Sequence, residues 1–334
     1  MGQTAAILDA DGTRLSPDEK AFFRDVDPWG FILFARNIDT PDQVRALCGD
    51  LRDAVGRNAL ITVDQEGGRV QRLRAPHWRE WAPPLDVVAR TGVDAPRAMF
   101  LMYRLIAAEL HSVGIDSNCA PMVDVAGAVT HDFLRNRCYS SDPDRVADVG
   151  RAVANGLLEG GVLPVVKHMP GHGRAQVDSH HDLPKVSAMP ADLTATDFAP
   201  FRALNDLPLG MTAHIVYDAL DPHPATCSPR MMQLIREEIG FDGLIMTDDI
   251  SMQALGGDPV ASTRAALAAG CDLALYCNAP LAQRIAVAEA AGPLTRAAED
   301  RAARALAWRQ PPQDVDIPAL EAEFDALLGG AGHG

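Results

Sequence analysis

The chain has 334 residues, of which 47% are hydrophobic and 22% charged, so it can bury a large core as an ordinary globular protein. Acidic residues outnumber basic ones by 45 to 30, which argues against nucleic-acid binding because contact with phosphates needs a positive field. No apolar run approaches the roughly 18 residues that a membrane helix needs, so we expect no membrane span.

The six cysteines form no CxxC pair and show no regular spacing, as is typical of reduced, buried thiols in a cytosolic protein. The first residues, Met1 to Thr4, show neither the basic nor the apolar region of a secretory signal. We therefore expect a cytoplasmic protein.

Short apolar runs alternate with helical patterns from one end of the chain to the other. The expected strands are Ala5–Leu8, Gly30–Phe34, Leu60–Val63, Ile115–Asn118, Leu163–Lys167, Leu209–Ala213, Gly243–Thr247 and Asp272–Tyr276. A capping residue followed by proline predicts helix starts at Ser16, Thr40, Asp142 and Ser228. Gly240 and Gly270 stand where helices are expected to end.

About eight strand-then-helix units, with strands apolar on both faces, predict an α/β fold with a parallel sheet. Their number and length favour a single (β/α)8 TIM-type barrel over an open doubly wound sheet. We expect one domain over 1–334, with the barrel at about 5–293 and C-terminal helices at 294–328. The last of these should lie near Ile317–Leu328, and a disordered tail is expected at 329–334.

Polar residues gather just after the carboxyl ends of seven of these strands. They are Arg36, Asn37, Asp64, Gln65, Glu66, Asn118, Lys167, His168, His214, Asp248, Asp249 and Asn278. In a barrel all these positions open onto one rim, where catalytic groups normally lie. Acids and bases mixed there, without a phosphate-binding glycine motif, indicate a polar neutral ligand such as a sugar.

The segment after the fifth expected strand is rich in histidine and has three interpretations. Its histidines are His168, His172, His180 and His181. They could bind a metal, but Pro170 and Gly171 prevent the helical spacing of a zincin, and no cysteine joins the cluster. They could be structural, bonding to the backbone. They could also serve acid–base catalysis, with Asp178 orienting His180 for proton exchange near neutral pH.

Two consecutive carboxylates, Asp248 and Asp249, follow the seventh expected strand. One of them could act as a nucleophile on a rigid strand end, while the other could cap the segment that follows. The residues alone do not distinguish these roles.

Three motifs together resemble glycoside hydrolase family 3, and within it the bacterial β-N-acetylhexosaminidases of the NagZ type. The motifs are Asp64 to Arg72 (DQEGGRVQR), Lys167 to Gly173 (KHMPGHG) with Asp178-Ser179-His180, and Thr247 to Met252 (TDDISM). The resemblance extends from about residue 5 to residue 280, with all motifs in the family's order.

The resemblance implies a single (β/α)8 barrel that removes terminal β-linked N-acetylglucosamine with retention of configuration. By position, Asp248 corresponds to the nucleophile, His180 to the proton donor and acceptor, and Asp178 to the residue that orients His180. The resemblance also assigns sugar binding to five residues: Asp64, Arg72, Arg137, Lys167 and His168. It implies no cofactor and no metal.

A histidine acid–base group departs from the pair of carboxylates that most glycosidases use. Neutral imidazole beside Asp248 avoids placing two like charges in one site, which would raise one pKa strongly. The implied substrate is a small peptidoglycan fragment, such as N-acetylglucosamine linked to 1,6-anhydro-N-acetylmuramic acid, with or without peptide. The expected partners include neither nucleic acid nor membrane, and a monomer is plausible.

Three alternatives remain at this stage. A phosphorylase of the same family would use phosphate in place of water. A metal-dependent hydrolase would use the histidine cluster and lose activity with a chelator. An inactive sugar-binding barrel is disfavoured, because every residue that the chemistry requires is present.

Overall fold

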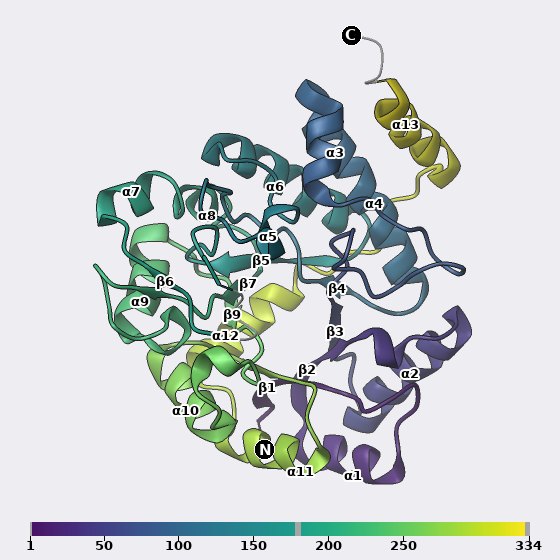
Figure 1. Ribbon diagram of the computed structural model, residues 1–334. Coiled ribbons are helices and arrows are strands. Elements are labelled where there is room, and N and C mark those ends of the chain that lie inside the picture. The colour runs from purple at the N-terminus through teal and green to yellow at the C-terminus, as the bar shows by residue number, and fades with distance from the viewer. Residues whose placement is uncertain (1, 178–181, 331–334) are drawn as a thin grey trace.

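Eight parallel strands form the centre of the structure, a computed structural model that describes residues 2–177 and 182–330. They are β1 (Thr4–Asp9), β2 (Pro28–Leu33), β3 (Leu60–Val63), β4 (Ser117–Asn118), β5 (Leu163–Met169), β7 (Leu209–Thr212), β9 (Leu244–Met246) and β10 (Ala274–Tyr276). Strands β10, β1, β2 and β3 pair in one run, and β4, β5, β7 and β9 in a second. The runs meet on both sides, because Cys119 N donates to Val63 O over 2.9 Å and Thr247 N to Leu273 O over 3.0 Å. The predicted barrel is therefore confirmed, with helices around the central strands (Figure 1).

All eight expected strands are present, with shifts at their ends. The second begins at Pro28 rather than Gly30, since a proline, which lacks an N–H donor, is tolerated as the first residue of a strand. The fourth keeps only Ser117–Asn118 of the expected 115–118. Two further strands, β6 (Lys185–Val186) and β8 (Val216–Tyr217), pair with each other outside the barrel, and the sequence analysis did not predict them.

Helices surround the barrel and extend beyond it. They are α1 (Pro17–Val26), α2 (Pro41–Val55), α3 (Pro84–Thr91), α4 (Ala95–Ser112), α5 (Asp132–Arg135), α6 (Pro143–Glu159), α7 (Pro190–Ala195), α8 (Ala199–Ala203), α9 (Pro229–Gln233), α10 (Pro259–Ala269), α11 (Leu281–Ala291), α12 (Arg296–Leu306) and α13 (Ile317–Gly330). A wider π-helical turn, Leu234–Ile239, continues α9 to Gly240. Gly270 ends α10, so both predicted C-caps are confirmed.

The predicted N-caps are also present. Ser16 Oγ accepts from Glu19 N over 3.1 Å, and the Glu19 carboxylate accepts from Ser16 N over 3.0 Å, which completes the capping box of α1. At α2 Thr40 accepts from Gln43 N over 3.3 Å. The Gln43 side chain accepts from Asp39 N over 2.8 Å rather than from Thr40 N, so α2 has an N-cap but no complete capping box.

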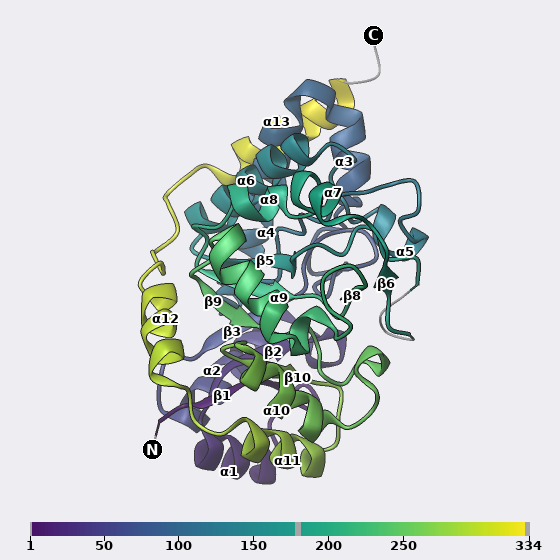
Figure 2. The same ribbon diagram turned by 90° about the vertical axis from the view of Figure 1, so that its left-hand side faces the viewer.

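Alternate strand residues fill the barrel interior, and α12 covers its amino-terminal end. Ile7, Leu60 and Val165 belong to one buried cluster that also contains Ala298 and Ala302 of α12. Figure 2 shows α12 on the side of the barrel opposite the β6–β8 pair. The carboxyl ends of the strands, where the polar residues lie, are thus the open end.

The last helix of the described residues is the predicted one, α13, which packs on α3 and α4. Phe324 is buried, and Arg97 of α4 makes two contacts of 2.7 Å with the Glu323 carboxylate. No helix within residues 2–177 and 182–330 is both long and apolar enough to cross a bilayer. Of the tail expected to be disordered at 329–334, Gly329 and Gly330 belong instead to α13, and the rest lies outside the described residues.

Candidate active site

A cavity of about 230 Å³ opens at the carboxyl ends of the barrel strands. This volume lies below the range typical of drug-sized pockets, so it suits a ligand the size of one sugar ring. Polar or charged residues in its wall are Asp64, Arg69, Arg72, Arg137, Lys167, His168, His172, Asp248, Asp249 and Asn278. The aromatic residues Phe34 and Phe133 lie among them, and Ile32, Met211 and Leu275 of the strands also line the cavity.

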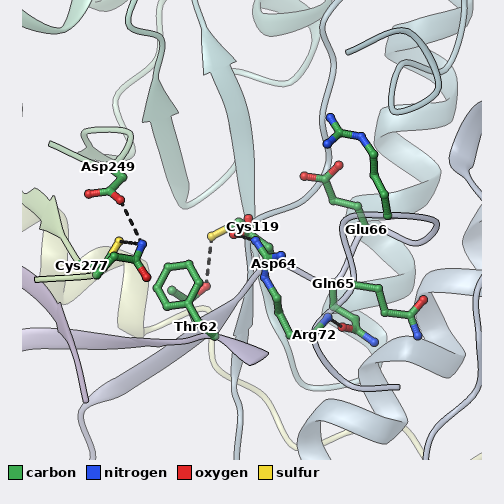
Figure 3. Close-up of polar contacts among 12 residues, drawn as sticks. Thr62, Asp64, Gln65, Glu66, Arg72, Cys119, Asp249 and Cys277 are labelled. Atoms are coloured by element: carbon green, nitrogen blue, oxygen red, sulfur yellow. Dashed lines mark hydrogen bonds and ion pairs between the residues drawn. The ribbon is translucent and has the colours of Figure 1, made fainter. Parts of the chain in front are cut away.

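Five charged side chains form one continuous network in the wall. Lys167 Nζ lies 2.8 Å from Asp64 Oδ1 and 2.6 Å from Glu66 Oε1. Arg137 donates two hydrogen bonds to the same carboxylate, from Nε to Glu66 Oε2 over 2.9 Å and from Nη2 to Oε1 over 2.8 Å. Arg72 donates to Asp64 Oδ2 over 3.1 Å. Figure 3 shows Asp64 and Arg72 close together and the Glu66 carboxylate facing a guanidinium.

The balance of charges in this network decides its protonation. Burial alone would raise the pKa of Asp64, but Lys167 and Arg72 outweigh it and hold that pKa well below its usual range. Burial has the same effect on Glu66, and Arg137 with Lys167 lowers its pKa to about 2. Burial opposes the charge of Lys167, yet Asp64 and Glu66 raise its pKa. All three groups are therefore ionised near neutral pH.

The segment after β3 is shaped by its neighbours so that Asp64 and Arg72 meet. Gln65 Oε1 accepts from Arg72 N over 2.8 Å, while Asn118 Oδ1 accepts from Gln65 N over 3.0 Å. Gly67 has φ +106°, and a Cβ there would lie 2.6 Å from Ala82 O, so only glycine fits this turn. Gln65 and Asn118 thus hold this segment in place without lining the cavity themselves.

Asp124, which the sequence analysis did not single out, holds two histidines of the wall. Its Oδ2 lies 2.7 Å from His168 Nδ1, and its Oδ1 accepts from His172 N over 2.6 Å. Burial alone would raise the pKa of Asp124, but His168 keeps it below its ordinary value. Burial, assisted by His168, lowers the pKa of His172 to about 4, so His172 is neutral near pH 7.

The two consecutive carboxylates after β9 have different tasks. Asp249 caps the next turn, because Oδ1 accepts from Ser251 N over 2.9 Å and Oδ2 from Ser251 Oγ over 2.7 Å. Asp248 accepts from Asp249 N over 2.8 Å and lines the cavity. Burial would raise the pKa of Asp248, but His168 and His214 help to lower it, so this carboxylate is ionised at neutral pH.

The structure brings six of the eight predicted site residues to one cavity wall: Asp64, Arg72, Arg137, Lys167, His168 and Asp248. The other two, Asp178 and His180, lie outside the described residues, as does His181. Six of the twelve polar strand-end residues do not line the cavity and contact other residues of the fold instead: Arg36, Asn37, Gln65, Glu66, Asn118 and His214.

Three features of the site were missed by the sequence analysis. Glu66 was noted only as a strand-end residue, yet it is the partner of Arg137. Asp124 follows the fourth expected strand, as acidic rim residues follow others, and that position was the available signal. Phe34 and Phe133 carried no pattern that marks a cavity wall.

The histidine-rich segment was also considered as a metal site. Among the described residues no group of three or more His, Cys, Asp or Glu side chains is arranged to hold a metal ion. His180 and His181 fall outside the described residues, and treatment with a chelator tests whether they bind a metal.

Comparison with known proteins places this geometry in a family. Residues 8–307 match the family model described as the glycosyl hydrolase family 3 N-terminal domain. A β-hexosaminidase of Pseudomonas aeruginosa is 38% identical over 293 residues, which cover 86% of each chain. A β-hexosaminidase of Methylococcus capsulatus is 39% identical over 306 residues, covering 89% of this chain and 87% of that protein.

Solved structures agree with the sequence relatives. NagZ from Neisseria gonorrhoeae, in complex with N-trifluoroacetyl-D-glucosamine, superposes with a TM-score of 0.84 at 28% identity, covering 99% of this chain and 98% of that one. LpqI of M. tuberculosis gives a TM-score of 0.76 at 28% identity and covers 92% of each chain. The family resemblance predicted from the three motifs is thus confirmed, and the chain belongs to glycosyl hydrolase family 3.

Proposed function

We propose that this family 3 β-hexosaminidase removes terminal, non-reducing β-1,4-linked N-acetylglucosamine from peptidoglycan fragments. The observation that carries the proposal is the ionised carboxylate of Asp248 in the wall of a cavity sized for one sugar ring. Within the described residues Asp248 has no cation within ion-pair distance, so its charge is available to a reacting carbon. A solved relative binds an N-acylglucosamine analogue, which supports the choice of sugar.

The charged network is proposed to hold the sugar. Asp64 and Arg72 would bond to hydroxyl groups, and Lys167, with two of its three N–H donors used by Asp64 and Glu66, has one left for the ligand. His168 and Arg137 reach the same cavity. Because the carboxylates fix these cations, the site is organised before the sugar arrives.

The mechanism proposed is a double displacement with retention. Asp248 attacks the anomeric carbon while His180 protonates the leaving oxygen, giving a covalent glycosyl-enzyme. His180 then takes a proton from water, which attacks the same carbon and releases Asp248. Asp178 would set the tautomer of His180 and stabilise its imidazolium. The roles of Asp178 and His180 rest on the motif alone.

The test compares Asp248→Ala and His180→Ala with wild type on an aryl β-N-acetylglucosaminide. We expect kcat to fall by about 10⁴-fold or more for Asp248→Ala and by on the order of 10²–10⁴-fold for His180→Ala. Asp258→Ala is the matched control, because Asp258 only caps α10 and should cost about 1 kcal/mol of stability. Unchanged turnover in both test variants would overturn the assignment.

Two variants of the assay address the alternative reactions. Release of a sugar 1-phosphate in phosphate buffer would show phosphorolysis in place of hydrolysis. Full activity after exhaustive treatment with EDTA would eliminate a metal-dependent mechanism, whereas loss of activity that zinc restores would support it. Comparing substrates with and without peptide on the aglycone would define the natural fragment.

We further propose that the chain works as a single domain, as a monomer, in the cytoplasm, on imported fragments during peptidoglycan recycling. All six cysteines are free thiols, which supports a reducing compartment. Activity in the cytoplasmic fraction of the source cell, carried by a species of monomer mass, would test this proposal.

A further inference from the structure

Asp124 is a fully buried carboxylate that bonds to the site but does not line the cavity. Asp124 comes after β4 in the chain, and its partner His168 lies 44 residues further on. Within the described residues, the only ion-pair partner of Asp124 is His168, and no lysine or arginine lies within that distance. A buried carboxylate of this kind is stabilised by the hydrogen bonds it accepts.

The bonds to Asp124 determine where its histidine partner carries a proton. The backbone N–H of His172 donates to Oδ1 over 2.6 Å, and that of His168 lies 3.4 Å from the same oxygen. Oδ2 faces His168 Nδ1 at 2.7 Å. An ionised carboxylate can only accept, so Nδ1 of His168 must carry a hydrogen.

The opposite ring nitrogen of His168 is available to a ligand. His168 lines the cavity, and Nε2 makes no hydrogen bond to any residue in the described part of the chain. When the ring is neutral, its proton on Nδ1 leaves a lone pair on Nε2. That atom can then accept a hydrogen bond from a sugar hydroxyl.

We propose that Asp124 is a positioning residue that keeps the proton of His168 on Nδ1, so that Nε2 accepts a hydrogen bond from a hydroxyl of the bound sugar. The kinetic part of this inference rests on the proposed function, in which His168 binds the sugar. The tautomer itself concerns the free protein and depends on no activity.

An isosteric substitution separates this role from a merely structural one. In Asp124→Asn, the oxygen must stay toward the backbone N–H of His172, which can only donate. The amide nitrogen is then forced to face His168 Nδ1 and to donate to it. Nδ1 becomes the acceptor, the proton moves to Nε2, and the hydrogen bond offered to the sugar changes its direction.

The first measurement is ¹⁵N NMR of the histidine rings, recorded at alkaline pH where the rings are neutral. We expect Nδ1–H in wild type and Nε2–H in Asp124→Asn. A wild-type spectrum with the proton on Nε2 overturns the proposal even if the variant does not fold. This measurement also stands if wild type proves inactive on N-acetylglucosaminides, which would refute the proposed function alone.

The second measurement is the kinetics of the same variants on an aryl β-N-acetylglucosaminide. We expect Asp124→Asn to raise KM by about 10- to 100-fold with a smaller change in kcat, because a buried polar group is left mismatched with the sugar. The matched control is Asp272→Asn. Asp272 is also a buried carboxylate, paired with Arg236 and Arg301 away from the cavity, and its loss should affect stability but not KM.

The third measurement places Asp124→Asn in a His168→Ala background. If Asp124 acts through His168, the substitution should raise KM by less than about twofold there. An equal rise in KM in both backgrounds would show that Asp124 only supports the fold, and would overturn the proposal.

Discussion

Two carboxylates lie beside an arginine at the carboxyl ends of barrel strands, but their pKa values are shifted in opposite directions. They are Asp64 after β3 and Asp9 at the end of β1. The pKa of Asp64 is held well below its usual range. Burial raises the pKa of Asp9 to about 6, although the backbone N–H of Asn278 and two arginines oppose it. Asp9 is 1% exposed and does not line the cavity.

The two carboxylates also differ in the charged groups around them. Three cations, Lys167, Arg72 and Arg137, surround the two carboxylates Asp64 and Glu66. Around Asp9 the ratio is reversed. Two arginines, Arg36 and Arg284, serve three carboxylates, Asp9, Asp11 and Glu19.

The fully buried Arg284 lies 3.6 Å from Asp9 Oδ1 and is divided among all three carboxylates of its cluster. An arginine in contact therefore does not by itself keep the pKa of a buried carboxylate below its usual range. Burial is the largest effect on the pKa of Asp9 and the nearby Asp249 adds to it, so the opposing cations do not outweigh them as they do at Asp64.

The largest expected effect concerns Glu66→Gln. This substitution leaves Arg137 and Lys167 buried with Asp64 as their remaining carboxylate. We expect the free energy of unfolding to fall by about 3–5 kcal/mol at pH 7, measured by urea denaturation. Asp50→Asn is the control, because the exposed Lys20–Asp50 pair at 3.0 Å should contribute less than about 1 kcal/mol.

The same pair of proteins tests the sign of the pH dependence. The pKa of Glu66 is lowered from 4.5 to about 2, so its stabilisation is complete above pH 4.5 and is lost as pH falls toward 2. The difference in unfolding free energy between wild type and Glu66→Gln should shrink over that window. A difference that stays constant down to pH 2 would contradict a lowered pKa.

Asp9→Asn should show the opposite trend. The pKa of Asp9 is raised from 3.8 to about 6, so the folded state holds the proton more tightly and wild-type stability falls as pH rises through this window. Relative to Asp9→Asn, wild type should lose roughly 2 kcal/mol between pH 4 and pH 6, out of about 3 kcal/mol over the whole titration. Denaturation of both proteins across this range measures it, and parallel curves would show that burial does not dominate at Asp9.

The smallest effect is expected for Arg36→Met. The Arg36 side chain is 34% exposed, so its ion pair with Asp9 should contribute less than about 1 kcal/mol to stability. Removing it takes away one of the charges that oppose the raised pKa of Asp9. The ¹³C carboxyl titration of Asp9 should therefore move above pH 6, whereas an unchanged midpoint would mean that Arg284 alone supplies the opposing charge.

Much of the fold follows from local patterns that the sequence displays directly. Apolar runs located all eight barrel strands to within a few residues, and cap-plus-proline pairs located the starts of α1, α2, α6 and α9. These signals need only neighbouring residues, because strand and helix periodicity and capping act over a few positions. The short β6–β8 pair was missed, since two residues per strand are too few to show alternation.

Part of the site was likewise predictable from the sequence, and part was not. The motifs placed Asp64, Lys167 and Asp248 at strand ends, and barrel topology then predicted that they share a rim. The sequence left open which of Asp248 and Asp249 faces the ligand, because both follow the same strand. In the structure both line the cavity, but Asp249 is held by Ser251, whereas Asp248 makes no contact of that kind among the described residues.

The sequence by itself determined the elements, their order and the chemical types of residue on the rim. Only the tertiary structure decided which charges meet. Glu66 and Arg137 are 71 residues apart, and Asp124 and His168 are 44 apart. Closure of the barrel brings such residues together and buries them. The protonation state of each buried group then depends on which charged groups it contacts. No local pattern encodes that outcome, because it depends on every charged group in contact at once.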